Sequence, residues 1–130
     1  MHINHLTHKV IGCAYKVHNV LGPGFLEKVY ENALKLELKK LGIQARQQVK
    51  LPVWYEGYQV GVYFPDLWIE EQLIIEIKAA VALAREHESK LLHYLTATGI
   101  DHGLLINFGS SVQIRRKFRE YASISAAEVR

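Results

Sequence analysis

The sequence has one cysteine, three prolines and no long apolar run, and each shortage excludes a class of protein. Cys13 has no partner for an internal disulfide, and its small apolar neighbours favour a buried side chain over a nucleophile. No apolar stretch approaches the ~20 residues that span a membrane, so we expect no membrane partner. The start of the chain lacks the basic and then apolar segments of a secretory signal, so we expect a cytoplasmic protein.

Internal repeats, low-complexity segments and proline- or serine-rich linkers are also absent. The 130 residues therefore predict a single domain, residues 1–130, with enough apolar side chains for a core. The formal net charge of +3 permits a polyanionic partner without requiring one. Near the C-terminus, Arg115, Arg116 and Lys117 form a basic cluster. This cluster is typical either of phosphate contacts or of a solvated edge on a slightly basic protein.

Hydrophobic spacing predicts a mixed α/β architecture. The predicted elements are helices over residues 6–21 and 25–41, strands over 49–54, 58–64, 64–69 and 73–78, a helix over 83–98 and a buried strand over 103–107. With the adjoining segments 58–64 and 64–69 counted as one strand, the order is α-α-β-β-β-α-β, followed by a basic tail. We expect a mixed four-stranded sheet flanked by helices.

The most informative segment is the apolar, β-branched run of residues 73–79, which carries Glu76 and Lys78. Its composition predicts a strand, and alternation of side chains places Ile74, Glu76 and Lys78 on one face. Helices before and after this strand predict a sheet that is covered on both faces. Unpaired charges are costly in such a place, so something must keep the acid and the amine there.

Asp66 can be placed beside this strand by the register of the hairpin. A two-residue Glu-Glu turn offers no glycine or asparagine for positive φ, so a three-residue loop at 70–72 is preferred. This loop sets Ile69 opposite Leu73 and Asp66 opposite Glu76, with the two carboxylates ~5 Å apart at Cβ. Like charges this close repel unless one is protonated or a cation lies between them, and oxygen ligands suit Mg²⁺ or Mn²⁺. The alternative is a cross-strand salt bridge on an exposed face.

Two acids on the second predicted helix differ in position. Glu27 lies in the first turn at the edge of the apolar face, where it either points inward or simply complements the helix dipole. Glu31 precedes Lys35 by four residues, so we expect a surface ion pair between them. On the later helix, a polar stripe either faces solvent or lines the same cleft as the paired carboxylates; its members are His87, Lys90 and Tyr94.

Pro65 and Asp66, followed by Glu76, Ile77 and Lys78, resemble the PD-(D/E)XK nuclease superfamily, given the acid on the preceding helix. Nearly the whole chain is similar to the small bacterial GxxExxxR proteins of that superfamily. The matching segments are residues 22–30, 51–53, 76–79, 91–95, 97–99 and 103–109. The chain departs from this pattern at Glu31, where the family name places arginine, and at Lys90, where similar proteins often carry glutamine.

The resemblance implies a restriction-endonuclease-like core and a magnesium-dependent endonuclease that hydrolyses phosphodiester bonds, with DNA as the expected substrate. It implies that Asp66, Glu76 and the carbonyl of Ile77 hold Mg²⁺ or Mn²⁺, with Glu27 contacting the ion directly or through water. Lys78 would orient the attacking water, and cleavage would leave a 3′-hydroxyl and a 5′-phosphate.

The resemblance also suggests substrate contacts outside the metal site. His87, Lys90 and Tyr94 would lie near the metal or the phosphates, and the cluster of Arg115, Arg116 and Lys117 would clamp the nucleic-acid backbone. A domain this small would need a homodimer to cut two strands. The alternative function is a non-catalytic module that binds nucleic acid or protein on the same fold.

Overall fold

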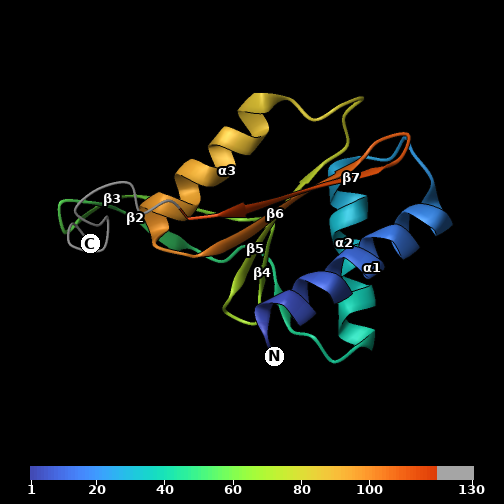
Figure 1. Ribbon diagram of the computed structural model, residues 1–130, viewed down its shortest axis with the longest axis horizontal. Coiled ribbons are helices and arrows are strands. Elements are labelled where there is room, and N and C mark those ends of the chain that lie inside the picture. Colours follow the sequence, from blue (N-terminus) through green and yellow to red (C-terminus); the bar gives the residue numbers. More distant parts are fainter. Residues whose placement is uncertain (120–130) are drawn as a thin grey trace.

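The computed structural model describes residues 1–119, so the last part of the predicted domain, up to residue 130, lies outside the described residues. Figure 1 shows the helices at the start of the chain, in blue and cyan, on one side of a twisted sheet and the later helix, in yellow and orange, on the other side. The helices are α1 (Ile3–Leu21), α2 (Glu27–Lys40) and α3 (Arg85–Thr98). The strands are β1 (Ala45–Arg46), β2 (Leu51–Tyr55), β3 (Tyr58–Tyr63), β4 (Leu67–Ile69), β5 (Leu73–Lys78), β6 (His102–Phe108) and β7 (Val112–Phe118).

The main sheet has five strands in the order β1-β4-β5-β6-β7, and β2 pairs with β3 in a separate hairpin. Within residues 1–119, β5 and β6 are the only neighbouring strands that run parallel, and the crossover between them contains α3. The predicted mixed α/β class is confirmed, but the prediction of a four-stranded sheet is wrong, because the main sheet has five strands. The predicted 49–64 hairpin lies outside the main sheet, and β1 and β7 complete that sheet at its two edges.

The segment that forms β7 was predicted to be a basic tail, and Arg116 interrupts the alternation of apolar residues in it. Val112 and Ile114 pack against the core on the face that carries α1, and Arg116 takes the next position on that face. Its guanidinium reaches Oδ1 of Asn4 at 2.8 Å. The charged side chain of Arg116 argues against a strand in the sequence pattern, but in the fold it has a hydrogen-bond partner on α1.

The sheet is covered on both faces, as predicted. Leu73, Ile75 and Ile77 pack into the core beneath α1 and α2, while Ile74 packs with Leu91 and Leu95 of α3. Alternation along β5 therefore sends Glu76 and Lys78 toward the side of α3 and the β2–β3 hairpin.

The β4–β5 hairpin has the predicted register, with Ile69 opposite Leu73 across a three-residue loop. Yet Glu70 and Glu71 both have positive φ, 51° and 55°, which is costly for residues with a Cβ. Glu70 exchanges two hydrogen bonds with the backbone of Gln44, one through its own N–H and one through its side chain. These contacts hold the strained turn in place.

Among residues 1–119, no helix is long and apolar enough to cross a membrane.

Candidate active site

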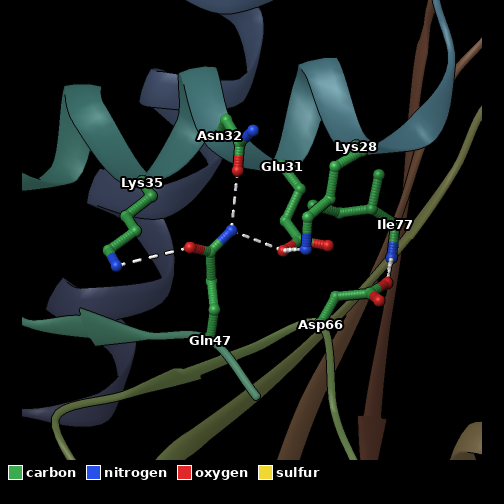
Figure 2. A network of polar contacts seen from close by, with 7 residues as sticks. All are labelled: Lys28, Glu31, Asn32, Lys35, Gln47, Asp66 and Ile77. Carbon is green, nitrogen blue, oxygen red and sulfur yellow. Dashed lines mark hydrogen bonds and ion pairs between the residues drawn. The ribbon is translucent and has the colours of Figure 1, made fainter.

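Asp66 lies immediately before β4 and is fixed against the end of β5. Its Oδ2 accepts a hydrogen bond from the backbone N–H of Ile77 at 2.7 Å (Figure 2). This contact follows from the antiparallel pairing of Leu67 with Ile75, which brings the chain before β4 alongside the last residues of β5. Register therefore places a carboxylate between the strand positions of Glu76 and Lys78.

Glu76 lies partly buried beneath the hairpin. Its Oε1 accepts a hydrogen bond from the hydroxyl of Tyr63 on β3, and the Tyr63 ring stacks on Tyr94 of α3 with centroids 3.9 Å apart. Burial, and after it the negative charge of Asp66, raise the pKa of Glu76 to about 7 against the opposing effects of Tyr63 and Lys78. A cation beside this carboxylate would favour its ionised form.

The pKa of Asp66 is also raised, chiefly because the carboxyl is removed from water. The hydrogen bond from Ile77 lowers this pKa, whereas the charges of Glu31 and Glu27 raise it. Two carboxyl groups with raised pKa values thus lie at one end of β5, together with the amine of Lys78. Perturbed carboxyl groups in a partly buried place are typical of a functional site.

Glu31 is not the surface residue that its sequence position predicted. It is only 5% exposed, and it pairs with Lys28 at 2.8 Å rather than with Lys35. Its Oε2 also accepts a hydrogen bond from Nε2 of Gln47 at 2.6 Å, while Lys35 donates to Oε1 of Gln47 at 3.4 Å (Figure 2). Glu31 therefore links α2 to the segment that follows β1.

A signal for this burial was present in the sequence. Glu31, Leu34 and Leu38 follow the i, i+3, i+7 spacing of one helix face, and all three are buried. A small cavity of about 80 Å³ is lined by Glu31, Lys28 and Asp66, so this acid lies on the α2 side of Asp66.

Glu27 is the first residue of α2 and is exposed. The negative charge of Glu27 contributes to the raised pKa of Asp66, so Glu27 lies close enough to influence the carboxyl group of Asp66. No group of three or more histidine, cysteine, aspartate or glutamate side chains within residues 1–119 is suited to hold a metal ion.

Asp66 and Glu76 supply carboxylate oxygens near the end of β5. Mg²⁺ binds in proteins through one or two carboxylates and keeps several waters. The donor set and the raised pKa values therefore fit a hard divalent cation that retains part of its water shell.

A cavity of about 290 Å³ opens beside Glu76 and Lys78, between β3 and α3. The polar stripe of α3 lines this cavity together with Glu76 and Lys78, but Asp66 does not; Asp66 lines the small cavity beside Glu31 instead. The other lining residues come from β3, α3 and β6, and the full set is Val62, Tyr63, Phe64, Glu76, Lys78, His87, Lys90, Leu91, Tyr94 and Leu105. Sequence reasoning missed Tyr63, because its contact with Glu76 depends on how the hairpin folds against α3.

The basic cluster of β7 does not line this cavity. Lys117 pairs with Glu88 of α3 at 2.8 Å, and Arg115 lies 4.0 Å from the same carboxylate. Arg116 points to the opposite face and binds Asn4. In this structure the cations of β7, an edge strand of the sheet, contact α3 on one face and α1 on the other.

The comparisons with known proteins concern the family and the fold of this chain. The family model described as the PD-(D/E)XK nuclease superfamily matches residues 4–120. The crystal structure of SSO0001 aligns with a TM-score of 0.55 and 18% identity, covering 89% of this chain and 58% of that one. The alkaline exonuclease LHK-Exo from Laribacter hongkongensis aligns with a TM-score of 0.48 and 11% identity, covering 82% of this chain and 76% of that one.

This chain spans less than two thirds of the SSO0001 chain, and at 18% identity the likeness shows the fold alone. No curated protein sequence gives a significant match. Together, the family match and the SSO0001 alignment confirm the expected restriction-endonuclease-like fold.

Proposed function

Because the chain belongs to the PD-(D/E)XK nuclease superfamily, we propose that it is a metal-dependent nuclease that hydrolyses phosphodiester bonds, with DNA as its substrate. The observation that carries this proposal is the hydrogen bond from Ile77 to Asp66, which holds one carboxylate between Glu76 and Lys78 at the end of β5. The ordered motifs along the chain support a narrower placement among the GxxExxxR proteins.

Asp66, Glu76 and the Ile77 carbonyl would hold Mg²⁺ or Mn²⁺, and Glu27 would contact the ion directly or through water. When bound, the ion would place positive charge at the scissile phosphate and lower the pKa of a water molecule. Tyr63 would keep one oxygen of Glu76 occupied and so fix the orientation of that carboxylate.

Lys78 would act on the reaction itself. Its amine lines the same cavity as Glu76, where it can orient the attacking water and offset the charge of the phosphate. In-line attack would then leave a 3′-hydroxyl and a 5′-phosphate.

Several further residues would hold the substrate. Lys90 and His87 of α3 line the cavity and would contact phosphates beside the scissile bond, while Tyr94 would support Tyr63 through its stacked ring. Arg115, Arg116 and Lys117 would contact the nucleic-acid backbone outside the cavity after exchanging their present partners.

The test is incubation of the purified protein with labelled single-stranded, duplex and branched DNA and with RNA, in Mg²⁺, Mn²⁺ or chelator. We expect cleavage that requires the metal and disappears in Lys78→Ala. Lys39→Ala, which removes an exposed lysine from the end of α2, is the matched control and should cut normally. Binding without cleavage under every metal condition would instead support a non-catalytic module on this fold.

A further inference from the structure

The outer face of α3 is polar and exposed. Leu91 and Leu95 of this helix are buried with residues of the sheet and the hairpin. On the opposite face an open hollow of about 520 Å³ has a lining that comes from α3 alone: Arg85, Glu86, Ser89, Lys90, His93 and Tyr94. We call this surface the α3 hollow. Its neighbours and its charges indicate what it binds.

The α3 hollow is continuous with the cavity of the candidate active site. Lys90 and Tyr94 line both of them. Lys90 therefore lies at the boundary, with Glu76 and Lys78 on the cavity side. A polymer that places one unit beside these two residues has a direct way out over α3.

The cations of the α3 hollow have no acidic partner. Within residues 1–119 the ion pairs involve other lysines and arginines, whereas Arg85 and Lys90 form none. His93 follows Lys90 by three residues, a spacing that makes two side chains neighbours on a helix surface. Its ring N–H can donate a hydrogen bond whether the ring is charged or neutral. These donors suit phosphate oxygens, and Glu86 is the one opposing acid among the lining residues.

Beyond the α3 hollow, positive charge continues onto the edge strand β7. Glu88 of α3 pairs with Lys117 at 2.8 Å and lies 4.0 Å from Arg115. The pKa of Glu88 is lowered chiefly by its hydrogen bond from Lys117, and also by the charges of Arg115 and Arg85. Arg85 therefore acts on the same carboxylate as the two cations of β7. Cationic side chains thus extend from the cavity across α3 to the edge of the sheet.

We propose that the sugar–phosphate backbone of the DNA substrate leaves the cavity over the outer face of α3. Lys90, His93 and Arg85 contact its phosphates in turn, and Arg115 and Lys117 receive the strand at the sheet edge. The inference rests on the proposed nuclease function. Because these contacts are made to phosphates, they position the strand without regard to its base sequence.

The test is fluorescence anisotropy with a labelled oligothymidylate of about 16 nucleotides, in chelator and at several salt concentrations. Arg85→Ala should weaken binding about fivefold, the upper range for one exposed ion pair. The slope of log affinity against log salt should become shallower by about 0.7, the value for one phosphate contact on a single strand. Arg85→Lys keeps the positive charge and should keep most of the wild-type slope.

Two further variants separate a local contact from a general effect of charge. Arg46→Ala removes an arginine from β1, at the opposite edge of the sheet, and should keep the wild-type affinity although it lowers the net charge equally. Glu86→Gln should tighten binding, because its carboxylate lines the same hollow and repels phosphates. Circular dichroism and thermal melting establish that each variant is folded.

Wild-type binding by Arg85→Ala would overturn the inference, as would an equal loss of affinity in Arg85→Ala and Arg46→Ala. Polyglutamate that binds more tightly than DNA, and loses this affinity in Arg85→Ala, would overturn it by assigning the α3 hollow to an acidic protein partner. Metal-dependent cleavage that requires Lys78, together with wild-type binding by Arg85→Ala, would overturn the inference and leave the nuclease proposal intact. Loss of DNA binding in Arg85→Ala alone, without cleavage by the wild type in any metal, would do the reverse.

Discussion

Oδ2 of Asp66 lies 2.7 Å from the backbone nitrogen of Ile77, which donates a hydrogen bond to it across the β4–β5 pair. The position of this carboxylate thus depends on sheet register rather than on the freedom of a side chain at the surface. Groups held by backbone contacts on rigid elements are well placed to act as metal ligands.

The first prediction concerns pH in the absence of metal. The pKa of Glu76 is raised from 4.5 to about 7, so between these values the folded protein keeps a proton that the unfolded chain releases. The stability contributed by this carboxyl is therefore complete below pH ~4.5 and is lost as the pH rises through about 7. The expected loss in the free energy of unfolding is about 3 kcal/mol. Urea unfolding in chelator at pH 5 and pH 8 measures it.

Glu76→Gln is the control for this pH effect, because it cannot ionise. It should remove most of the difference between the two pH values, and Mn²⁺ should stabilise the wild type more at pH 8 than at pH 5. A wild-type profile that matches that of Glu76→Gln would contradict the assignment of the effect to Glu76.

The second prediction concerns the hydroxyl of Tyr63. Tyr63→Phe keeps the ring stacked on Tyr94 but removes the hydrogen bond to Glu76. We expect Mn²⁺ affinity to fall about tenfold, as is typical when a partner of a metal ligand is lost. Isothermal titration calorimetry measures this change. Tyr58→Phe is the control, because it removes a hydroxyl from the exposed end of the hairpin and should bind Mn²⁺ normally. If Tyr63→Phe binds Mn²⁺ as tightly as Tyr58→Phe, Tyr63 does not position Glu76.

The third prediction separates the two acids of α2. Glu31→Ala removes the partner of Lys28 and of Gln47 in a buried place, so the free energy of unfolding should fall by about 1–3 kcal/mol. Glu27→Ala changes an exposed residue and should alter stability by less than ~0.5 kcal/mol. Chemical denaturation of both variants tests the contrast.

Cleavage assays on the same two variants test the proposed metal contact. Glu27→Ala should cut at least about tenfold more slowly at limiting Mg²⁺, even though it is as stable as the wild type. Undiminished cleavage by this variant would remove Glu27 from the metal site.

The fourth prediction concerns Lys90, whose side chain lines the cavity. Lys90→Ala should weaken the binding of single-stranded DNA, and the slope of log affinity against log salt should become shallower by about 0.7, the value for one phosphate contact on a single strand. Anisotropy at several salt concentrations gives the slope. Lys39→Ala is the surface control and should keep the wild-type slope of log affinity against log salt. If Lys90→Ala also keeps that slope, Lys90 makes no phosphate contact.

Local patterns were sufficient to predict the strand that carries Glu76 and its pairing with the strand after Asp66. Alternation fixes which side chains are buried, and the length of the 70–72 loop fixes the register. The three main helices were also predictable, because each has an apolar stripe and ends close to a glycine.

Features that depend on long-range contacts could not be predicted in this way. Arg116 breaks the apolar pattern of β7, and its contacts with Asn4 and Thr7 of α1, which lie far away in the sequence, accommodate it there. The Tyr63 contact with Glu76 requires the hairpin to fold beneath α3. Glu31 was misassigned because an ion pair four residues along the helix was considered before the buried stripe that it shares with Leu34.

The central claim is that the carboxylate of Asp66 is required for metal-dependent cleavage. The most direct test is cleavage of labelled DNA in Mg²⁺ or Mn²⁺ by the wild type, by Asp66→Asn and by Glu37→Gln, which changes an acid of α2 that pairs with Lys16 of α1. We expect cleavage by the wild type and Glu37→Gln and none by Asp66→Asn, with all three proteins folded. Equal metal-dependent cleavage by Asp66→Asn would contradict the account.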